Sequence, residues 1–263
     1  MPIQQMLLGL GGVSDVEYAA SDNQTNIVLS TVFGSDWASN KPKIYTVASG
    51  VDVGGTNTHA IHADSGMGGT LSIVVAGTVT GFGGVGGAGG AGGYGTNGIN
   101  NIPNPYAGSD GVSGTAGGTA IRIDSSNVTV TNTGTISGGG GGAGGSGGAG
   151  GYRYWVHGRY GGTGGAGGNG AGWNQSQSNG SAGTQGGTSS GNSGGSYPGS
   201  AGGNGGTLGN DGQQGQVGNN YGGGWSYQSR TPGGYRGLHG AAGAAIAGSS
   251  YTLSNSGTIN GAS

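Results

Sequence analysis

The segment HAIHAD at residues 59–64 contains the residue types from which a metal site or an acid–base pair could be built. If the segment is a strand, His62 and Asp64 lie on one face, whereas His59 lies on the other. A metal site with three ligands would therefore need a bend in the strand. We interpret His62 and Asp64 as a pair on the surface, and we predict neither a bound metal nor a cofactor.

The carboxylates are distributed too unevenly for the hydrolysis of glycosidic bonds, which uses a pair of them. Asp211 is the only carboxylate after residue 124. Asp52, Asp64, Asp110 and Asp124 could meet in space, but their spacing does not require it. The pattern Gly-x-Gly-x-x-Gly occurs through composition alone and is never followed by Gly-Lys-Ser/Thr. We predict no catalytic residues and no enzyme, with a depolymerase as a disfavoured alternative.

The sequence favours binding over catalysis, because aromatic and arginine residues cluster in three segments that connect the glycine-rich runs. These connectors are 96–107, 152–160 and 219–233. Tyr, Trp and Arg carry much of the energy of protein interfaces, and Tyr with Gly, Ser and Asn is typical of antibody binding loops. The alternative role of the rings is to cap glycine-rich segments, which suits Tyr94 and Tyr152. The predicted receptor-binding residues are Tyr106, Arg153, Tyr154, Trp155, His157, Arg159, Tyr160, Tyr221, Trp225, Tyr227 and Arg230.

The glycines that flank these connectors have a regular spacing. The chain has 263 residues, of which 75 are Gly. Between residues 82 and 94 every third residue is not glycine, and the same period of three continues in later runs. This is the repeat of the polyproline II helix, whereas a flexible linker needs no phase. We predict a bundle of polyglycine II (polyproline II-type) helices, in which Ala88→Leu and Gly→Ala in 138–151 both destabilise.

Three repeats interrupt the glycine runs, at residues 59–81, 119–138 and 244–261. Each begins with Ala-Ile, continues through an alternating strand and closes on Gly-Thr-(Val/Ile)-x-Gly. Such alternation indicates half-buried strands, so the repeats predict a small β-layer that carries the bundle. The fold class is therefore mostly irregular and β. The runs leave this layer and return to it, which puts the three aromatic connectors at the far end, while the direction of the chain in 171–198 stays open.

The N-terminal residues 1–58 are predicted to be a small β-rich attachment region ahead of a body at 59–263. The apolar residues near the start are the predicted docking contacts. No basic segment precedes them, and their run is too short for a signal peptide or a membrane span, so we expect no membrane insertion. These residues are Met6, Leu7, Leu8 and Leu10.

The charge of the chain is small and unevenly placed. The net charge is −2, and no cysteine is present to form disulfides or thiolate metal sites. Residues 1–124 hold eight acids and three bases, whereas residues 125–263 hold one acid and four bases. Nucleic-acid binding needs clustered Lys and Arg, so we expect no nucleic-acid partner.

The segment VTVTNTGTISGGGGGAGGSGGAGG at residues 128–151 resembles the Gly-rich tail-fibre tip adhesins of T-even-type and related bacteriophages. The segment at 47–84 is similar to the sequence before glycine runs in other phage tail-fibre proteins, and the likeness covers roughly residues 44–263. Residues 1–43 do not match the attachment domain of the T-even proteins.

This resemblance implies an extracellular protein at the tip of a tail fibre of the virion. Its loops would bind an outer-membrane protein or surface glycan of the bacterium, and its N-terminal region would bind a tail-fibre or baseplate protein. The alternative is a Gly-rich structural or ice-binding protein without a specific receptor. That class would favour repeated Thr or Ala and few aromatic connectors, the opposite of this composition.

Overall fold

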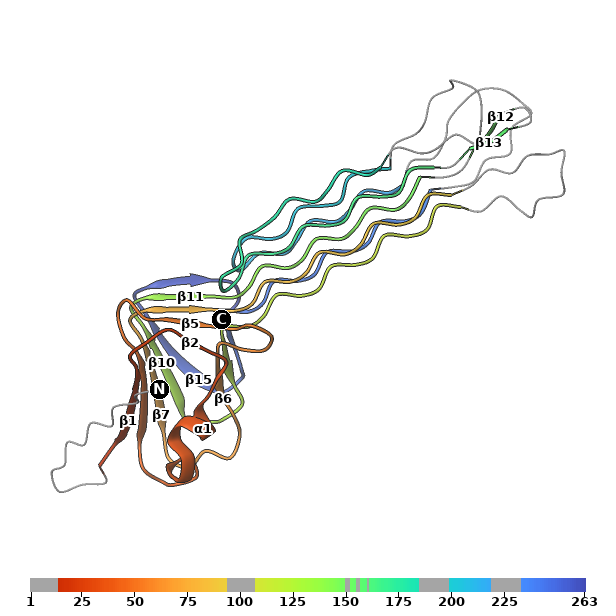
Figure 1. Ribbon diagram of the computed structural model, residues 1–263. Coiled ribbons are helices and arrows are strands. Elements are labelled where there is room, and N and C mark those ends of the chain that lie inside the picture. The colour runs from red at the N-terminus through yellow and green to blue at the C-terminus, as the bar shows by residue number, and fades with distance from the viewer. Residues whose placement is uncertain are drawn as a thin grey trace.

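The computed structural model describes residues 14–93, 107–149, 152–154, 157–159, 161–184, 199–218 and 233–263. A body built of short strands carries a long bundle of extended segments (Figure 1). Helix is confined, within the described residues, to α1 (Leu29–Phe33) and the 3-10 turn η1 (Gly34–Asp36). The fold is therefore mostly β and irregular, as predicted.

The body is a solenoid whose chain winds through three parallel sheets. The first contains β1 (Val16–Ala20), β4 (Lys43–Val47), β7 (Leu71–Val75), β10 (Val128–Asn132) and β15 (Tyr251–Asn255) in that order. The second contains β2 (Gln24–Thr25), β5 (Asp52–Gly54), β8 (Thr78–Thr80), β11 (Thr135–Ser137) and β16 (Thr258–Asn260). The third contains β3 (Ile27–Val28), β6 (Ile61–Ala63), β9 (Ile121–Ile123) and β14 (Ile246–Ala247).

The predicted repeats align in this solenoid. Ile121 pairs in register with Ile61 on one side and with Ile246 on the other. Ile136 likewise pairs with Val79 and Ile259. Stacking like residues on like residues buries a continuous core that no single coil could bury alone.

The solenoid also contains two coils that the sequence repeat does not reveal. β1 to β3 form one and β4 to β6 the other, and Ile27 lies in register with Ile61. The pattern is hidden because Gly-Thr-(Val/Ile)-x-Gly is missing from residues 14–58 and α1 interrupts the spacing. Strands on both sides of residue 58 thus share all three sheets, so no break in the sheets marks the predicted boundary.

Alternate residues of the strands fill the inside of the solenoid. Leu71, Ile73 and Val75 of β7 are at most 1% exposed, and Tyr45 and Val130 of the neighbouring strands are buried beside them. The intervening side chains face outward, as the period of two requires. These residues form one hydrophobic core that runs along the solenoid.

A buried lysine ties together the loops at the edge of this core. Lys43 is 1% exposed, and its Nζ donates to the carbonyl oxygens of Ser39, Lys41 and Gly68 at 2.9, 2.9 and 2.7 Å. Burial lowers the pKa of the Lys43 ammonium from its ordinary value. Three charge-assisted hydrogen bonds replace the lost water and join the loop after η1 to the loop before β7.

The bundle leaves the solenoid at one corner, between the second and third sheets. One excursion connects β8 to β9 and the other connects β11 to β14. In the described residues they comprise eight extended segments that lie side by side (Figure 1). These segments are 81–93, 107–118, 138–149, 161–171, 177–184, 199–207, 211–218 and 233–244.

Segment 138–149 is the centre of the bundle and is buried along its whole length. Every third N–H donates to the same neighbour, as when Gly142 and Gly145 donate to Thr115 and Val112, both at 2.9 Å. It donates to three neighbours and accepts at its carbonyls from three others. The neighbours that accept are 107–118, 161–171 and 211–218, and those that donate are 81–93, 199–207 and 233–244.

Glycine is required in the central segment because neighbouring backbones touch it. A Cβ on Gly139, Gly142, Gly145 or Gly148 would overlap the carbonyl oxygen of Phe82, Val85, Ala88 or Ala91, respectively. Val85, Ala88 and Ala91 are exposed in the structure, so the premise of the Ala88→Leu prediction does not hold and we now expect that substitution to be tolerated.

Candidate functional site

The three predicted connectors and a fourth one have their ends at the far end of the bundle. Counted as all residues between two bonded segments, the four connectors are 94–106, 150–160, 185–198 and 219–232, and they lie wholly or mostly outside the described residues. Their flanking residues are held together by backbone hydrogen bonds. Gly93 donates to Ala149 at 2.8 Å, and Gly161 donates to Gly93 at 2.9 Å. Segments that are distant in sequence thus end side by side.

The same bonding continues to the other connectors. Gly148 donates to Ser109 at 3.0 Å, and Gly234 donates to Gly148 at 2.9 Å. Gly218 donates in turn to Gly234 at 2.9 Å. The three predicted reversals therefore start and finish at one end of the bundle, opposite the solenoid.

Backbone structure within the connectors is described only for a short hairpin. β12 (Tyr152–Tyr154) pairs antiparallel with β13 (His157–Arg159), and Arg153 lies opposite Gly158. This hairpin contains the predicted residues Arg153, Tyr154, His157 and Arg159 and makes the predicted reversal. The other predicted binding residues lie outside the described residues: Tyr106, Trp155, Tyr160, Tyr221, Trp225, Tyr227 and Arg230.

The fourth connector, 185–198, was not predicted. Thr184 donates to Thr163 at 2.9 Å and Gly199 donates to Thr184 at 2.8 Å, which places both of its ends at the far end. The sequence does contain a pattern that could have revealed the segment before this connector, because Ser178, Ser181 and Thr184 are spaced three residues apart. Their hydroxyls accept from the N–H groups of Asn169, Ala166 and Thr163 at 2.8, 2.8 and 3.1 Å.

The chain also reverses twice at the solenoid end of the bundle. Gly172 and Gln175 exchange backbone hydrogen bonds in one turn, and Asn210 donates to Thr207 in the other. Trp173 lies in the first turn, where its N–H donates to Gly81 at 3.0 Å. Trp173 therefore lies at the opposite end of the bundle from the aromatic connectors.

The connectors carry a net positive charge. The four connectors contain Arg153, Arg159 and Arg230 and no carboxylate. The two carboxylates of the bundle are bound to backbone instead: Asp110 accepts from Tyr235 and Asp211 from Ala242, both at 2.7 Å. Most acidic residues lie in the solenoid, so the acids and the connector arginines belong to different parts of the chain.

The segment HAIHAD does not form the predicted pair. Asp64 accepts from the N–H of Ser30 at 3.1 Å, whereas His62 Nε2 lies 2.8 Å from Oδ2 of Asp124. Burial lowers the pKa of His59, whose ring lies 5.5 Å from that of His62. Asp124, the partner of His62, lies on the next coil of the solenoid. The stacking of the coils therefore determines this pairing. In the described part of the chain, no three His, Asp or Glu side chains could hold a metal ion.

None of the helices in the described residues has the length and hydropathy that crossing a membrane requires.

The chain is similar to one protein family and to one solved structure. The family model "Phage tail fibre adhesin Gp38" matches residues 15–263. The crystal structure of the gp37-gp38 adhesin tip complex of the bacteriophage S16 long tail fibre is similar with 18% identity and a TM-score of 0.42, over 94% of this chain and 81% of that chain. No curated protein sequence matches the chain.

Proposed function

Because this chain belongs to the phage tail fibre adhesin family, we propose that it binds a receptor on the host cell with the connectors at the far end of its bundle. The observation that carries the proposal is the bonding of the connector ends, which brings four separate segments to one tip. Loops held by a rigid scaffold are a common design for recognition.

The glycine-rich segments are, in this proposal, polyglycine II helices. Their hydrogen bonds recur every third residue on each face of segment 138–149, which suits a helix with three residues per turn. At about 3.1 Å per residue such a segment spans roughly 37 Å. The helices would thus hold the tip well away from the solenoid.

The composition of the connectors favours a polar, partly anionic receptor surface. Trp155, Trp225 and the connector tyrosines supply aromatic contact area, while Arg153, Arg159 and Arg230 supply positive charge. An outer-membrane protein loop or a surface glycan offers matching groups. Positive charge at the tip would also speed the approach to a negatively charged cell surface.

Competition with the phage tests this function. Host cells that have been saturated with the purified chain should adsorb the phage several-fold more slowly, because the chain occupies the receptor. The control is the same chain on cells of a strain that the phage does not adsorb to, where no binding is expected. Unchanged adsorption to saturated host cells would contradict the proposal.

Attachment to the virion is proposed for residues 1–58, with a tail-fibre or baseplate protein as partner. The apolar residues proposed to make the docking contacts lie outside the described residues: Met6, Leu7, Leu8 and Leu10. β1 is at the edge of the first sheet, so the segment before it leaves from one end of the solenoid.

Deleting residues 1–12 should abolish incorporation of the chain into virions without unfolding it. The core begins at Val16, so the deletion removes no buried side chain of the described solenoid. Immunoblots of purified virions measure incorporation, and circular dichroism with thermal unfolding checks the fold. Normal incorporation of the shortened chain would disprove the assignment.

A further inference from the structure

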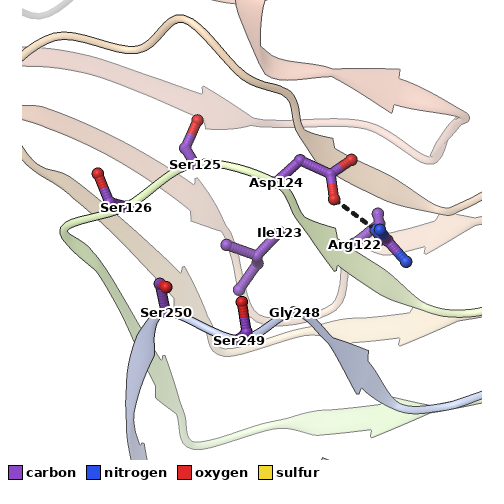
Figure 2. A pocket seen from close by; sticks show the side chains of 8 residues that line it. All are labelled: Arg122, Ile123, Asp124, Ser125, Ser126, Gly248, Ser249 and Ser250. Carbon is purple, nitrogen blue, oxygen red and sulfur yellow. Dashed lines mark hydrogen bonds and ion pairs between the residues drawn. The ribbon is translucent and has the colours of Figure 1, made fainter.

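A polar hollow of about 540 Å³ lies on the solenoid body, away from the far end of the bundle. Two stretches on consecutive coils line it: residues 122–126, which run from the end of β9 into the next turn, and residues 248–250 after β14 (Figure 2). It shares no residue with the connectors.

The hollow exists because the two turns differ in length. Arg122 pairs with Ala247 and Val128 pairs with Tyr251. Between these pairs the upper turn has residues 123–127 and the lower turn only 248–250. The shorter turn cannot cover the longer one, and Gly248 lies so close that a Cβ there would meet the carbonyl oxygen of Ile123.

Asp124 is held in a fixed position at this hollow. Its Oδ1 accepts from Arg122 Nε at 2.7 Å, and its Oδ2 lies 2.8 Å from His62 Nε2 (Figure 2 shows the first contact). These hydrogen bonds hold the pKa of Asp124 below its ordinary value. The carboxylate therefore stays ionised at neutral pH, with lone pairs left to accept further hydrogen bonds.

Other polar groups at the hollow have no partner within the described residues. They are the terminal nitrogens of Arg122 and the hydroxyls of Ser126, Ser249 and Ser250. Figure 2 places the Arg122–Asp124 pair toward one end of the lining and Ser126 and Ser250 toward the other, so the hollow offers both donors and acceptors.

The charges of the site select the class of ligand. Asp124 repels an anion and Arg122 repels a cation, so neither simple ion fits both groups. Neighbouring hydroxyls of a sugar can donate to the carboxylate and accept from the guanidinium and the serines. We propose that this hollow binds a neutral sugar residue of a cell-surface polysaccharide or of a free saccharide. The proposal does not depend on the receptor-binding role of the tip.

The test is an NMR titration of the full chain with the methyl α-glycosides of glucose, galactose and mannose, and with a neutral bacterial O-polysaccharide. We expect saturable shifts of the amides in 122–126 and 248–250 with at least one of them. Tighter binding of the polysaccharide would identify the cell surface as the source, and equal affinities would identify a single sugar residue. Asp124→Asn and Arg122→Gln should each weaken binding at least tenfold, since each removes a charged hydrogen-bonding partner.

Asp52→Asn is the matched control, because it neutralises an acid on β5 of the same body and should leave the affinity unchanged. The spectrum of the remaining amides shows whether each variant is folded. Ser250→Ala, a smaller change, should weaken binding in the same direction. The double change Trp155→Ala and Trp225→Ala should leave this titration unaltered, so failure at the tip and failure here are distinguishable.

Three results would overturn the proposal. One is the absence of shifts at these two turns with every saccharide. Another is a response of the two turns to inorganic phosphate or Ca²⁺ in place of sugars. The third is sugar binding that Asp124→Asn and Arg122→Gln leave unchanged.

Discussion

Replacing Gly142 with alanine should destabilise the bundle by about 3 kcal/mol, at the upper end of the usual cost of overpacking. The added Cβ would overlap the carbonyl oxygen of Val85, a backbone atom that cannot rotate away. Displacing it strains the hydrogen bonds of Gly142 to Thr115 at 2.9 Å and from Gly240 at 2.7 Å. The expected fall in Tm is roughly 6–12 °C. Thermal unfolding and amide exchange along segment 138–149 measure it.

Ala88→Leu is the matched control for that substitution. It adds a larger group to the same bundle, but on an exposed ridge, so stability should change by less than about 0.5 kcal/mol. If the glycine-rich runs were flexible linkers, the two substitutions would affect stability in the opposite order. There, Gly142→Ala would be neutral or slightly stabilising because alanine restricts the unfolded chain. An unchanged or raised Tm for Gly142→Ala would rule out close backbone contact at this position.

Replacing Trp155 and Trp225 together with alanine should reduce adsorption to the host on the order of 1,000-fold. Each tryptophan that anchors an interface is worth about 2 kcal/mol or more, and the two lie in different connectors. Stability should hardly change, because both residues lie beyond the bonded ends of the bundle, where Ala149 donates to Gly162 and Gly218 donates to Gly234. Adsorption rates of phage carrying the variant and the Tm of the purified chain give the two measurements.

Trp173→Ala separates this effect from a general loss of tryptophan. Trp173 lies in the turn at the solenoid end, against Gly54 of β5, where a Cβ would overlap its ring. Its removal should lower the Tm and leave adsorption intact, the reverse of the result at the tip. If the double variant still adsorbs normally, the aromatic connectors are not the receptor-binding site.

The bundle could be predicted from the sequence because the requirement for glycine at every third position is a local one. Every third residue of an extended glycine-rich segment bonds to the same neighbour, so the bare positions repeat with that period and can be read from the sequence. The sequence could not reveal which side chains are buried. Ala143 is 0% exposed and Ala88 is exposed, although both interrupt glycine runs at the same spacing. The number of neighbours around each segment decides the difference.

For the candidate site, the sequence predicted three of the four connectors whose ends meet at the far end of the bundle. The excursions 82–118 and 139–243 must each begin and end at the β-layer, so each has one more reversal at the far end than at the solenoid end. The second excursion also turns at 172–176 and 208–210, and it adds the connector 185–198. These turns were hidden because segments 177–184 and 199–207 are short and bond through serine and threonine as well as glycine.

The sequence by itself determined the type of each segment: strands where apolar residues alternate, and extended glycine-rich segments where glycine recurs every third residue. Both periods are set by the geometry of a few neighbouring residues. Only the tertiary structure decided which segments became neighbours. It joined residues 16–54 to the same solenoid, placed 138–149 at the centre of the bundle and gave His62 a partner in Asp124. Those contacts depend on the stacking of coils that are far apart in the chain, which leaves no local pattern in the sequence.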